Sequence, residues 1–177
     1  MAEFVCALDE ILYSGVCNER GGIRVAYWAE YNGVDWDTML GDDTKFNATT
    51  GIILGYTMLG GAVFNKVDSL RKEARYQAEF TSDTDLYTTA VNFRFRGKSN
   101  TRKNSLQSAI TCCAIVLHIY SNDGTQRVIG VDWNGATFNP YLEPLRISRH
   151  LDAGGQLSTS KAGDELDLSA ESYNAPV

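Results

Sequence analysis

Two long stretches of alternating residues, joined by a short polar turn, constrain this chain more than any other feature. Apolar residues stand at every second position from Ala74 to Phe80, and Tyr, Thr, Val and Phe alternate with mostly polar residues from Tyr87 to Phe95. A period of two is typical of strands that are wet on one face. Because Ser-Asp-Thr-Asp separates the stretches, they are predicted to pair as an antiparallel hairpin.

The second face of this hairpin is predicted to be polar and exposed. It carries Glu73, Arg75, Gln77, Glu79, Thr88, Asn92 and Arg94. Because carboxylates accompany the guanidinium groups, the affinity of this face for phosphate is expected to be small. On the residues alone, an ordinary solvent-exposed sheet face is the simplest interpretation.

The chain after Gly97 predicts a short helix and two further strands. Leu106, Ala109 and Ile110 lie at helical spacing behind an N-cap at Ser99 or Asn100. The apolar run 112–121 then predicts a buried strand. Asn-Asp-Gly-Thr turns it into residues 126–133, a further strand of the same sheet.

Alternating residues predict strands near both ends of the chain as well. Residues 23–31 predict the first strand, and residues 145–151 and 166–173 predict the last two. Another hairpin is expected between residues 51–59 and 62–70, around Gly60-Gly61.

Two polar stretches predict long connections. Residues 32–50 are rich in Asp, Asn, Thr and Gly, and residues 152–165 are rich in Gly and Ser. The expected fold is mainly β: an antiparallel β-sandwich or a partly open β-barrel with one short flanking helix. Residues 23–173 are expected to form a single domain, preceded by an arm or loop at 1–22 and followed by a tail at 174–177.

The charge balance argues against a general nucleic-acid or membrane binder. The net charge is -6 and the pI is near 4.9, so the overall field repels polyanions and anionic membranes. The opening residues lack a basic segment before an apolar core, which secretory peptides have. The apolar runs are far shorter than the ~20 residues that span a bilayer. We therefore expect synthesis and folding in the cytoplasm.

The cysteines and histidines do not form a recognisable site in the sequence. Cys6, Cys17, Cys112 and Cys113 lack the spacing of metal ligands, and we expect them to be reduced thiols. His118 lies in the apolar run, where a hydrogen-bonded core histidine is the expected role.

No nucleophile, relay or phosphate-binding motif stands out in the chain. Asp42-Asp43 and the acidic residues at 164–167 could bind a cation, but acidic loops are usually only solvated. Paired carboxylates for glycoside hydrolysis remain an open alternative. We expect the protein not to be an enzyme, and we expect no catalytic residue, cofactor or metal site.

The order of these elements resembles that of a known protein family. The long alternating hairpin, the short helix, the buried strand and "SNDGTQRVIGVDW" together resemble the tail tube proteins of bacteriophages, over about Glu73 to Trp133. The late strand, Gly and Ser rich stretch and last strand of residues 145–171 are similar to the end of that family. The tube protein of bacterial secretion systems uses the same fold and is a near neighbour.

The resemblance implies a virion structural protein, a tail tube subunit that forms rings, commonly of six subunits. Such rings stack into a hollow tube through which DNA passes transiently. The central sheets of neighbouring subunits join around the ring, and their polar faces line the channel. The implied channel-lining residues are Glu73, Arg75, Gln77, Glu79, Thr88, Asn92 and Arg94, with Arg75 and Arg94 expected to pair with Glu73 or Glu79. The implied location is the virion tail, and the implied partners are other copies and other tail or neck proteins, with no membrane.

The two long connections are candidates for contact between stacked rings, because a tube subunit must touch neighbours above and below. The residues proposed for these contacts are Asp35, Asp37, Asp42, Asp43, Gly154, Gly155, Ser158 and Ser160. The main alternative function is another phage structural protein, such as a tail terminator, a head-to-tail connector or a capsid decoration protein. A soluble binding module or an enzyme ranks below both.

Overall fold

Two antiparallel sheets of four strands each dominate the computed structural model. It describes residues 22–69, 74–97, 100–112, 114–122, 124–153, 163–174 and 176. The first sheet, here called the short sheet, has the strand order β4 (Asn65–Val67), β1 (Ile23–Glu30), β7 (Ile115–Ser121) and β8 (Gln126–Ile129). The second, called the long sheet, has the order β11 (Glu143–Ala153), β12 (Gly163–Ser172), β6 (Leu86–Arg96) and β5 (Arg75–Thr81).

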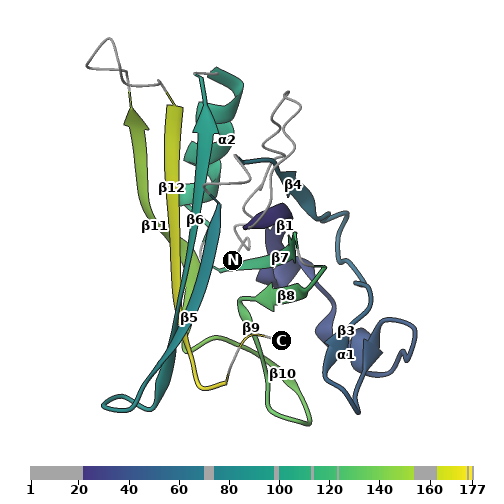
Figure 1. Ribbon diagram of the computed structural model, residues 1–177. Coiled ribbons are helices and arrows are strands. Elements are labelled where there is room, and N and C mark those ends of the chain that lie inside the picture. The colour runs from purple at the N-terminus through teal and green to yellow at the C-terminus, as the bar shows by residue number, and fades with distance from the viewer. Residues whose placement is uncertain are drawn as a thin grey trace.

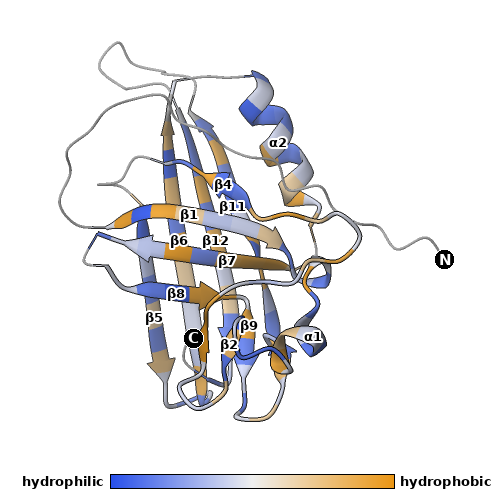
Figure 2. Cartoon of the chain, turned by 90° about the vertical axis from the view of Figure 1, so that its right-hand side faces the viewer, coloured by the Kyte–Doolittle hydropathy of each residue, from blue (hydrophilic) through white to orange (hydrophobic). Residues whose placement is uncertain are grey.

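The two sheets pack face to face, with the strands of the short sheet running across those of the long sheet (Figure 2). In Figure 1 the long sheet forms one side of the molecule, and the other described elements lie on its inner side. The fold is therefore mainly β, consistent with a β-sandwich, and the sheets are not closed into a barrel. Of the two alternatives that the sequence left open, the β-sandwich is the one with which the structure is consistent.

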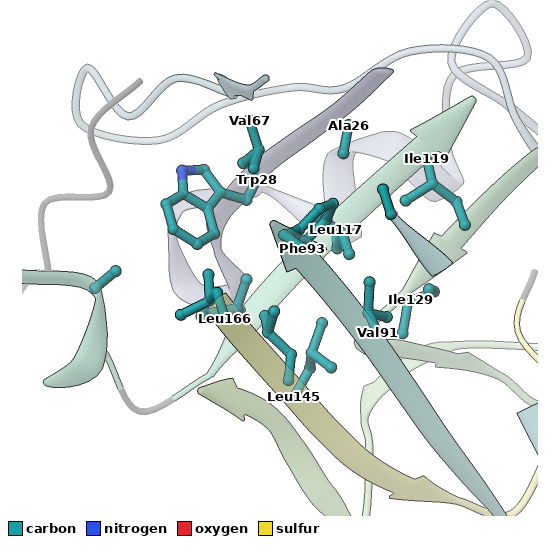
Figure 3. Packing of buried hydrophobic residues seen from close by; sticks show 14 of the residues in the cluster. Ala26, Trp28, Val67, Val91, Phe93, Leu117, Ile119, Ile129, Leu145 and Leu166 are labelled. Carbon is teal, nitrogen blue, oxygen red and sulfur yellow. The ribbon is translucent and has the colours of Figure 1, made fainter. Parts of the chain in front are cut away.

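The main core lies between the two sheets (Figure 3). Trp28 of β1 and Leu117 of β7 contact the same cluster as Phe93 of β6 and Leu166 of β12, and all four side chains are fully buried. Phe93 and Leu166 come from the apolar sides of alternating strands, so the pattern of period two determines which side of each strand enters the core. Leu117 lies in a strand with several successive buried residues. Trp28, whose face the sequence did not decide, points into this core.

One helix closes the core at the end of the long sheet. α2 (Asn100–Ile110) buries Leu106 and Ala109 against the main cluster. This is the short flanking helix that the spacing of its apolar residues predicted. Among its buried residues, Arg102 is the one that carries a charge.

A second, smaller core covers the outer side of the short sheet. It joins Val116 and Val128 of that sheet to Trp36 and Met39 of α1 (Trp36–Leu40). The remaining short elements are η1 (Tyr31–Gly33), β2 (Phe46–Asn47) paired with β3 (Ile52–Ile53), and β9 (Val131–Trp133) paired with β10 (Phe138–Pro140). The stretch expected as a long connection thus contains a helical turn that packs a tryptophan.

The hairpin predicted around Gly60-Gly61 is wrong. β3 pairs with β2, whereas β4 pairs with β1 of the short sheet. The chain between them turns where Ala62 donates a backbone hydrogen bond to Leu59 at 2.8 Å. The two apolar stretches therefore find partners in other parts of the chain, because nearby strands compete with distant ones for edge positions.

The strand predicted at 126–133 is interrupted at Gly130. Its φ is +100°, a conformation that L residues other than glycine rarely adopt. β8 stays in the short sheet, and β9 leaves it to pair with β10. The sequence predicted the extended residues correctly but not the change of sheet.

Cys112 is disulfide-bonded, which contradicts the expectation that it is a reduced thiol. The other three cysteines lie outside the described residues. Disulfides persist in oxidising environments. The prediction failed because cysteine spacing in a sequence does not reveal which thiols approach each other in the fold.

Candidate assembly surface

The outer face of the long sheet carries an ordered array of charged and polar side chains. The array consists of rows of residues that lie opposite each other across the four strands. One row runs Arg149, Asp167, Asn92, Arg75 from β11 to β5, the next runs Arg146, Ser169, Ala90, Gln77, and the third runs Glu143, Glu171, Thr88, Glu79. A fourth begins with Leu151, Glu165 and Arg94.

This array contains the described residues of the predicted polar hairpin face. Arg75, Gln77 and Glu79 on β5 lie beside Asn92 and Thr88 on β6, and Arg94 follows on β6. Glu73 lies outside the described residues. The structure thus gathers these side chains on one exposed face, as the alternation predicted, while their role as a channel wall stays a prediction.

Ion pairs neutralise the centre of this face. Arg94 contacts Glu165 at 3.0 Å, and Arg149 contacts Asp167 at 3.1 Å and Glu165 at 3.4 Å. Asn92 donates a hydrogen bond to Asp167 at 2.8 Å. The hydrogen bond from Arg149 to Asp167 also raises the pKa of that guanidinium above its usual value. Both carboxylates belong to β12, which the sequence did not place beside the hairpin.

The two edge positions on β5 are less constrained. Among the described residues, neither Arg75 nor Glu79 has an ion-pair partner, and both are exposed. Arg75 borders a shallow hollow of about 300 Å³ that the ion-paired residues Arg94, Arg149, Glu165 and Asp167 also line. A polar hollow with paired charges is suited to contact with water or a polar surface rather than to binding of an apolar ligand.

The charges are unevenly distributed along the strands. At the end where β5 turns into β6, the sheet carries the exposed residues Glu79, Asp83, Asp85 and Glu143 and the half-buried Glu171. Residues 79–88 contain no lysine or arginine. The four arginines of the array all lie farther from the turn. The hairpin end of the sheet is therefore acidic.

Both outer strands of the long sheet have a side without a strand partner among the described residues. β5 pairs only with β6, and β11 only with β12. Because the sheet has four antiparallel strands, β5 and β11 run in opposite directions, as Figure 1 shows. Unpaired edges expose backbone N–H and C=O groups that can pair with another chain.

Two of the four predicted ring-stacking residues that the structure describes have local roles. Asp35 caps α1, accepting hydrogen bonds from the backbone N–H of Thr38 at 3.1 Å and from its hydroxyl at 2.7 Å. Asp42 accepts similar bonds from Thr44. These bonds lower the pKa of both carboxyls. Asp37 and Asp43 are exposed.

The stacking candidates of the second connection cannot be compared with the structure. Gly154, Gly155, Ser158 and Ser160 lie outside the described residues. The contact between rings that was assigned to both connections stays a prediction.

The buried titratable groups lie away from the assembly surface. His118 bonds to the Tyr56 hydroxyl at 3.1 Å and to the Gln126 side-chain oxygen at 3.2 Å, and burial lowers the pKa of His118 while it raises that of Tyr56. The hydrogen-bonded core histidine expected from the sequence is confirmed. This arrangement holds two strands and a loop together, which accounts for it without catalysis.

A second buried group joins α2 to the long sheet. Arg102 contacts Asp164 at 2.8 Å, and the other oxygen of Asp164 lies 3.4 Å from His150. The Arg102 guanidinium also lies over the ring of Phe95, 5.4 Å from its centre. His150 thus contacts an acid that lies 14 positions later in the chain, a contact that the residues around His150 did not predict.

Within the described ranges, no group of three or more His, Cys, Asp or Glu residues is placed to hold a metal ion. Among the helices of that same part of the chain, none is long and apolar enough to span a membrane.

Sequence reasoning missed half of the array. Arg146, Arg149, Glu165, Asp167 and Glu171 lie on β11 and β12. The alternation of residues 145–151 predicted that Arg146 and Arg149 lie on opposite sides of the strand. That prediction is wrong, because a register shift between Ile147 and Arg149 brings both to the outer face. No local signal indicated that β12 would lie beside β6, because strand order depends on contacts between residues far apart in the sequence.

Comparison with known proteins adds no relative to this picture: no family model matches the chain, and no curated protein or solved structure is significantly similar to it.

Proposed function

We propose that this protein is a structural subunit of a phage tail tube, which assembles into rings that stack around a channel for DNA. The observation that carries the proposal is the long sheet. It combines an exposed polar face with two edges of opposite direction that lack a strand partner among the described residues. The sequence resemblance to tail tube proteins supplies the specific identity.

The direction of the edges supports closure into a ring. If copies are related by rotation about an axis roughly parallel to the strands, β5 of one copy runs antiparallel to β11 of the next. Each junction can then continue the antiparallel hydrogen-bond pattern of the sheet. Such pairing also satisfies the exposed edge groups, which otherwise favour aggregation.

The charges of the outer face support its role as the wall of a DNA channel. The rows contain four arginines and five carboxylates, and the central arginines are paired with carboxylates of the same sheet. A wall that carries slightly more negative than positive charge does not retain a polyanion. DNA can therefore pass such a wall without being bound.

Electron microscopy of the purified protein tests the proposal. We expect negatively stained samples, over a range of protein and salt concentrations, to contain hollow rings or stacked tubes, and sedimentation velocity to detect a concentration-dependent oligomer. A small closed oligomer without a channel would favour a decoration or connector protein instead. A monomer at every concentration, with no ring, would contradict the proposal.

A further inference from the structure

The charges on the two open edges restrict how neighbouring copies can align. Within the sheet, Arg75 on β5 lies level with Arg149 on β11, and Glu79 lies level with Glu143. If β5 met β11 of the next copy at the same height, arginine would face arginine and glutamate would face glutamate. Like charges directly opposite each other destabilise a strand pair. A level junction is therefore disfavoured.

We propose that β5 pairs with β11 of the next copy in a register shifted by one row, so that Glu79 lies opposite Arg146. This inference rests on the proposed ring assembly and specifies its lateral contact. In the same register, Gln77 lies opposite Arg149 and Arg75 lies opposite Leu151. Both like-charge pairs disappear, and one pair of opposite charges forms.

The surroundings of the two charges support this choice of partners. Among the described residues, the side chain of Glu79 has neither a hydrogen-bond nor an ion-pair partner. Arg146 has Glu143, at 3.4 Å, as its one ion-pair partner in the described part of the chain, and its side chain is 55% exposed. Arg149, in contrast, is held by two carboxylates of β12. Arg146 is therefore the more available cation on the β11 edge.

The opposite shifts are less favourable. A shift by one row the other way places Arg75 opposite Arg146, which again brings like charges together. A shift by two rows that way places Arg75 opposite Glu143, but β5 begins at Arg75 and β11 begins at Glu143, so almost no strand pairing remains. Charge and strand length thus select one direction.

A shifted register also agrees with the geometry of a closed sheet. Strands that close into a barrel tilt from its axis, and the tilt requires the register to be staggered around the ring. Level junctions would leave the strands parallel to the axis. The proposed shift at every junction supplies a stagger in one consistent sense.

Charge reversal tests the contact. Glu79→Arg alone places two guanidinium groups opposite each other at every junction, and Arg146→Glu alone places two carboxylates there. Each variant should therefore need a roughly tenfold or higher protein concentration to form rings. In an equimolar mixture, the two variants can alternate around a ring. Each junction then joins β5 of one variant to β11 of the other, so that opposite charges face each other again. The double variant Glu79→Arg/Arg146→Glu restores opposite charges at every junction and should assemble near the wild-type concentration.

Two controls accompany these variants. Glu171→Arg makes the same change of charge in the same row as Glu79, but on the inner strand β12, so it should leave the concentration needed for assembly nearly unchanged. Thermal unfolding of each variant establishes that the subunits fold. Sedimentation velocity measures assembly, and negative-stain images count the rings.

The outcomes separate this inference from the proposed function. If the wild type forms rings but the single variants assemble equally well, or the double variant does not recover, the Glu79–Arg146 contact is overturned while the ring stands. If the wild type forms no ring, both are overturned. Recovery in the double variant supports the contact, because a loss caused by misfolding would not be repaired by a second charge reversal.

Discussion

Gly130 is the residue whose conformation most clearly requires glycine. Its φ is +100°, and a Cβ there would lie 2.2 Å from the backbone oxygen of Ile115. Backbone atoms cannot move aside without disturbing β7, which lies at the centre of the short sheet. Local backbone conformation and packing therefore restrict the same position.

We predict that Gly130→Ala lowers the free energy of unfolding by more than the ~1 kcal/mol expected for a strained φ alone. Gly135→Ala is a matched control, because Gly135 has a φ of +90° but nothing within 4 Å of the added Cβ. Urea denaturation of both variants makes the comparison. Equal losses would contradict the role of the Ile115 contact.

Phe93 and Phe80 provide a second comparison between single residues on neighbouring strands. Phe93 is fully buried between the sheets, whereas Phe80 is 51% exposed near the hairpin turn. We predict that Phe93→Ala costs about 3–5 kcal/mol of unfolding free energy, as large cavities in cores do, and that Phe80→Ala costs clearly less. Similar urea midpoints for the two variants would contradict the described core.

His118 should make stability depend on pH in one direction. Burial lowers its pKa below the usual 6.5, so the unfolded chain binds a proton at a higher pH than the folded chain does. Its contribution to stability is therefore complete above pH 6.5 and is lost as the pH falls through the folded pKa.

We predict that the wild type loses more unfolding free energy between pH 7.5 and a pH about one unit below 6.5 than His118→Gln does. Glutamine keeps polar atoms near Tyr56 and Gln126 but does not titrate. Urea titrations at the two pH values provide the measurement, and an NMR titration of the His118 ring gives the pKa directly. A folded pKa above 6.5 would contradict the expected direction.

At the scale of elements, the central hairpin, the flanking helix and the last two strands could be predicted from the sequence. Their apolar residues recur with periods of two and 3.6, and such periods report which side of an element is buried. The hairpin around Gly60-Gly61 could not be predicted correctly, because both stretches are apolar yet each pairs with a different strand. Periodicity identifies a strand but not its partner.

In the candidate surface too, some features follow from neighbouring residues in the sequence, and others depend on residues far apart in it. Arg75 and Asn92 were placed on one face by alternation alone. The ion pair between Arg94 and Glu165 could not be foreseen, because it depends on β12 lying beside β6. The disulfide at Cys112 was missed as well, because cysteine spacing alone does not show which thiols are oxidised.

The attachment of α2 to the long sheet depends on a buried ion pair. Arg102 and Asp164 are both more than nine-tenths buried as side chains and lie 2.8 Å apart. Removing one partner leaves the other charge buried and uncompensated. The cost of such a change is therefore larger than the net contribution of the pair.

We predict that Arg102→Met lowers the unfolding free energy by about 3–5 kcal/mol. The double variant Arg102→Met/Asp164→Leu should recover much of this loss, because it removes the unpaired carboxylate as well. Denaturant unfolding of the two variants and of Asp164→Leu completes a double-mutant cycle. Additive losses in the cycle would contradict a coupled pair.

At the scale of the whole molecule, the long sheet is covered by other described elements on one face only. Its inner face is buried by the short sheet and α2, while its outer face and both edges are open within the described chain. A ring would cover the edges and leave the polar face toward a central space. The open edges and face are therefore consistent with the proposed assembly.

The acidic end of the long sheet has a consequence for any assembly in which all copies point the same way. Every hairpin turn, with Asp83 and Asp85, would then lie on one rim of the ring, and the opposite rim would differ from it. Two rings could not meet acidic rim to acidic rim without strong repulsion. The two ends of a tube built from such rings would differ in charge. A factor that starts growth of the tube and a factor that stops it would therefore meet chemically different surfaces.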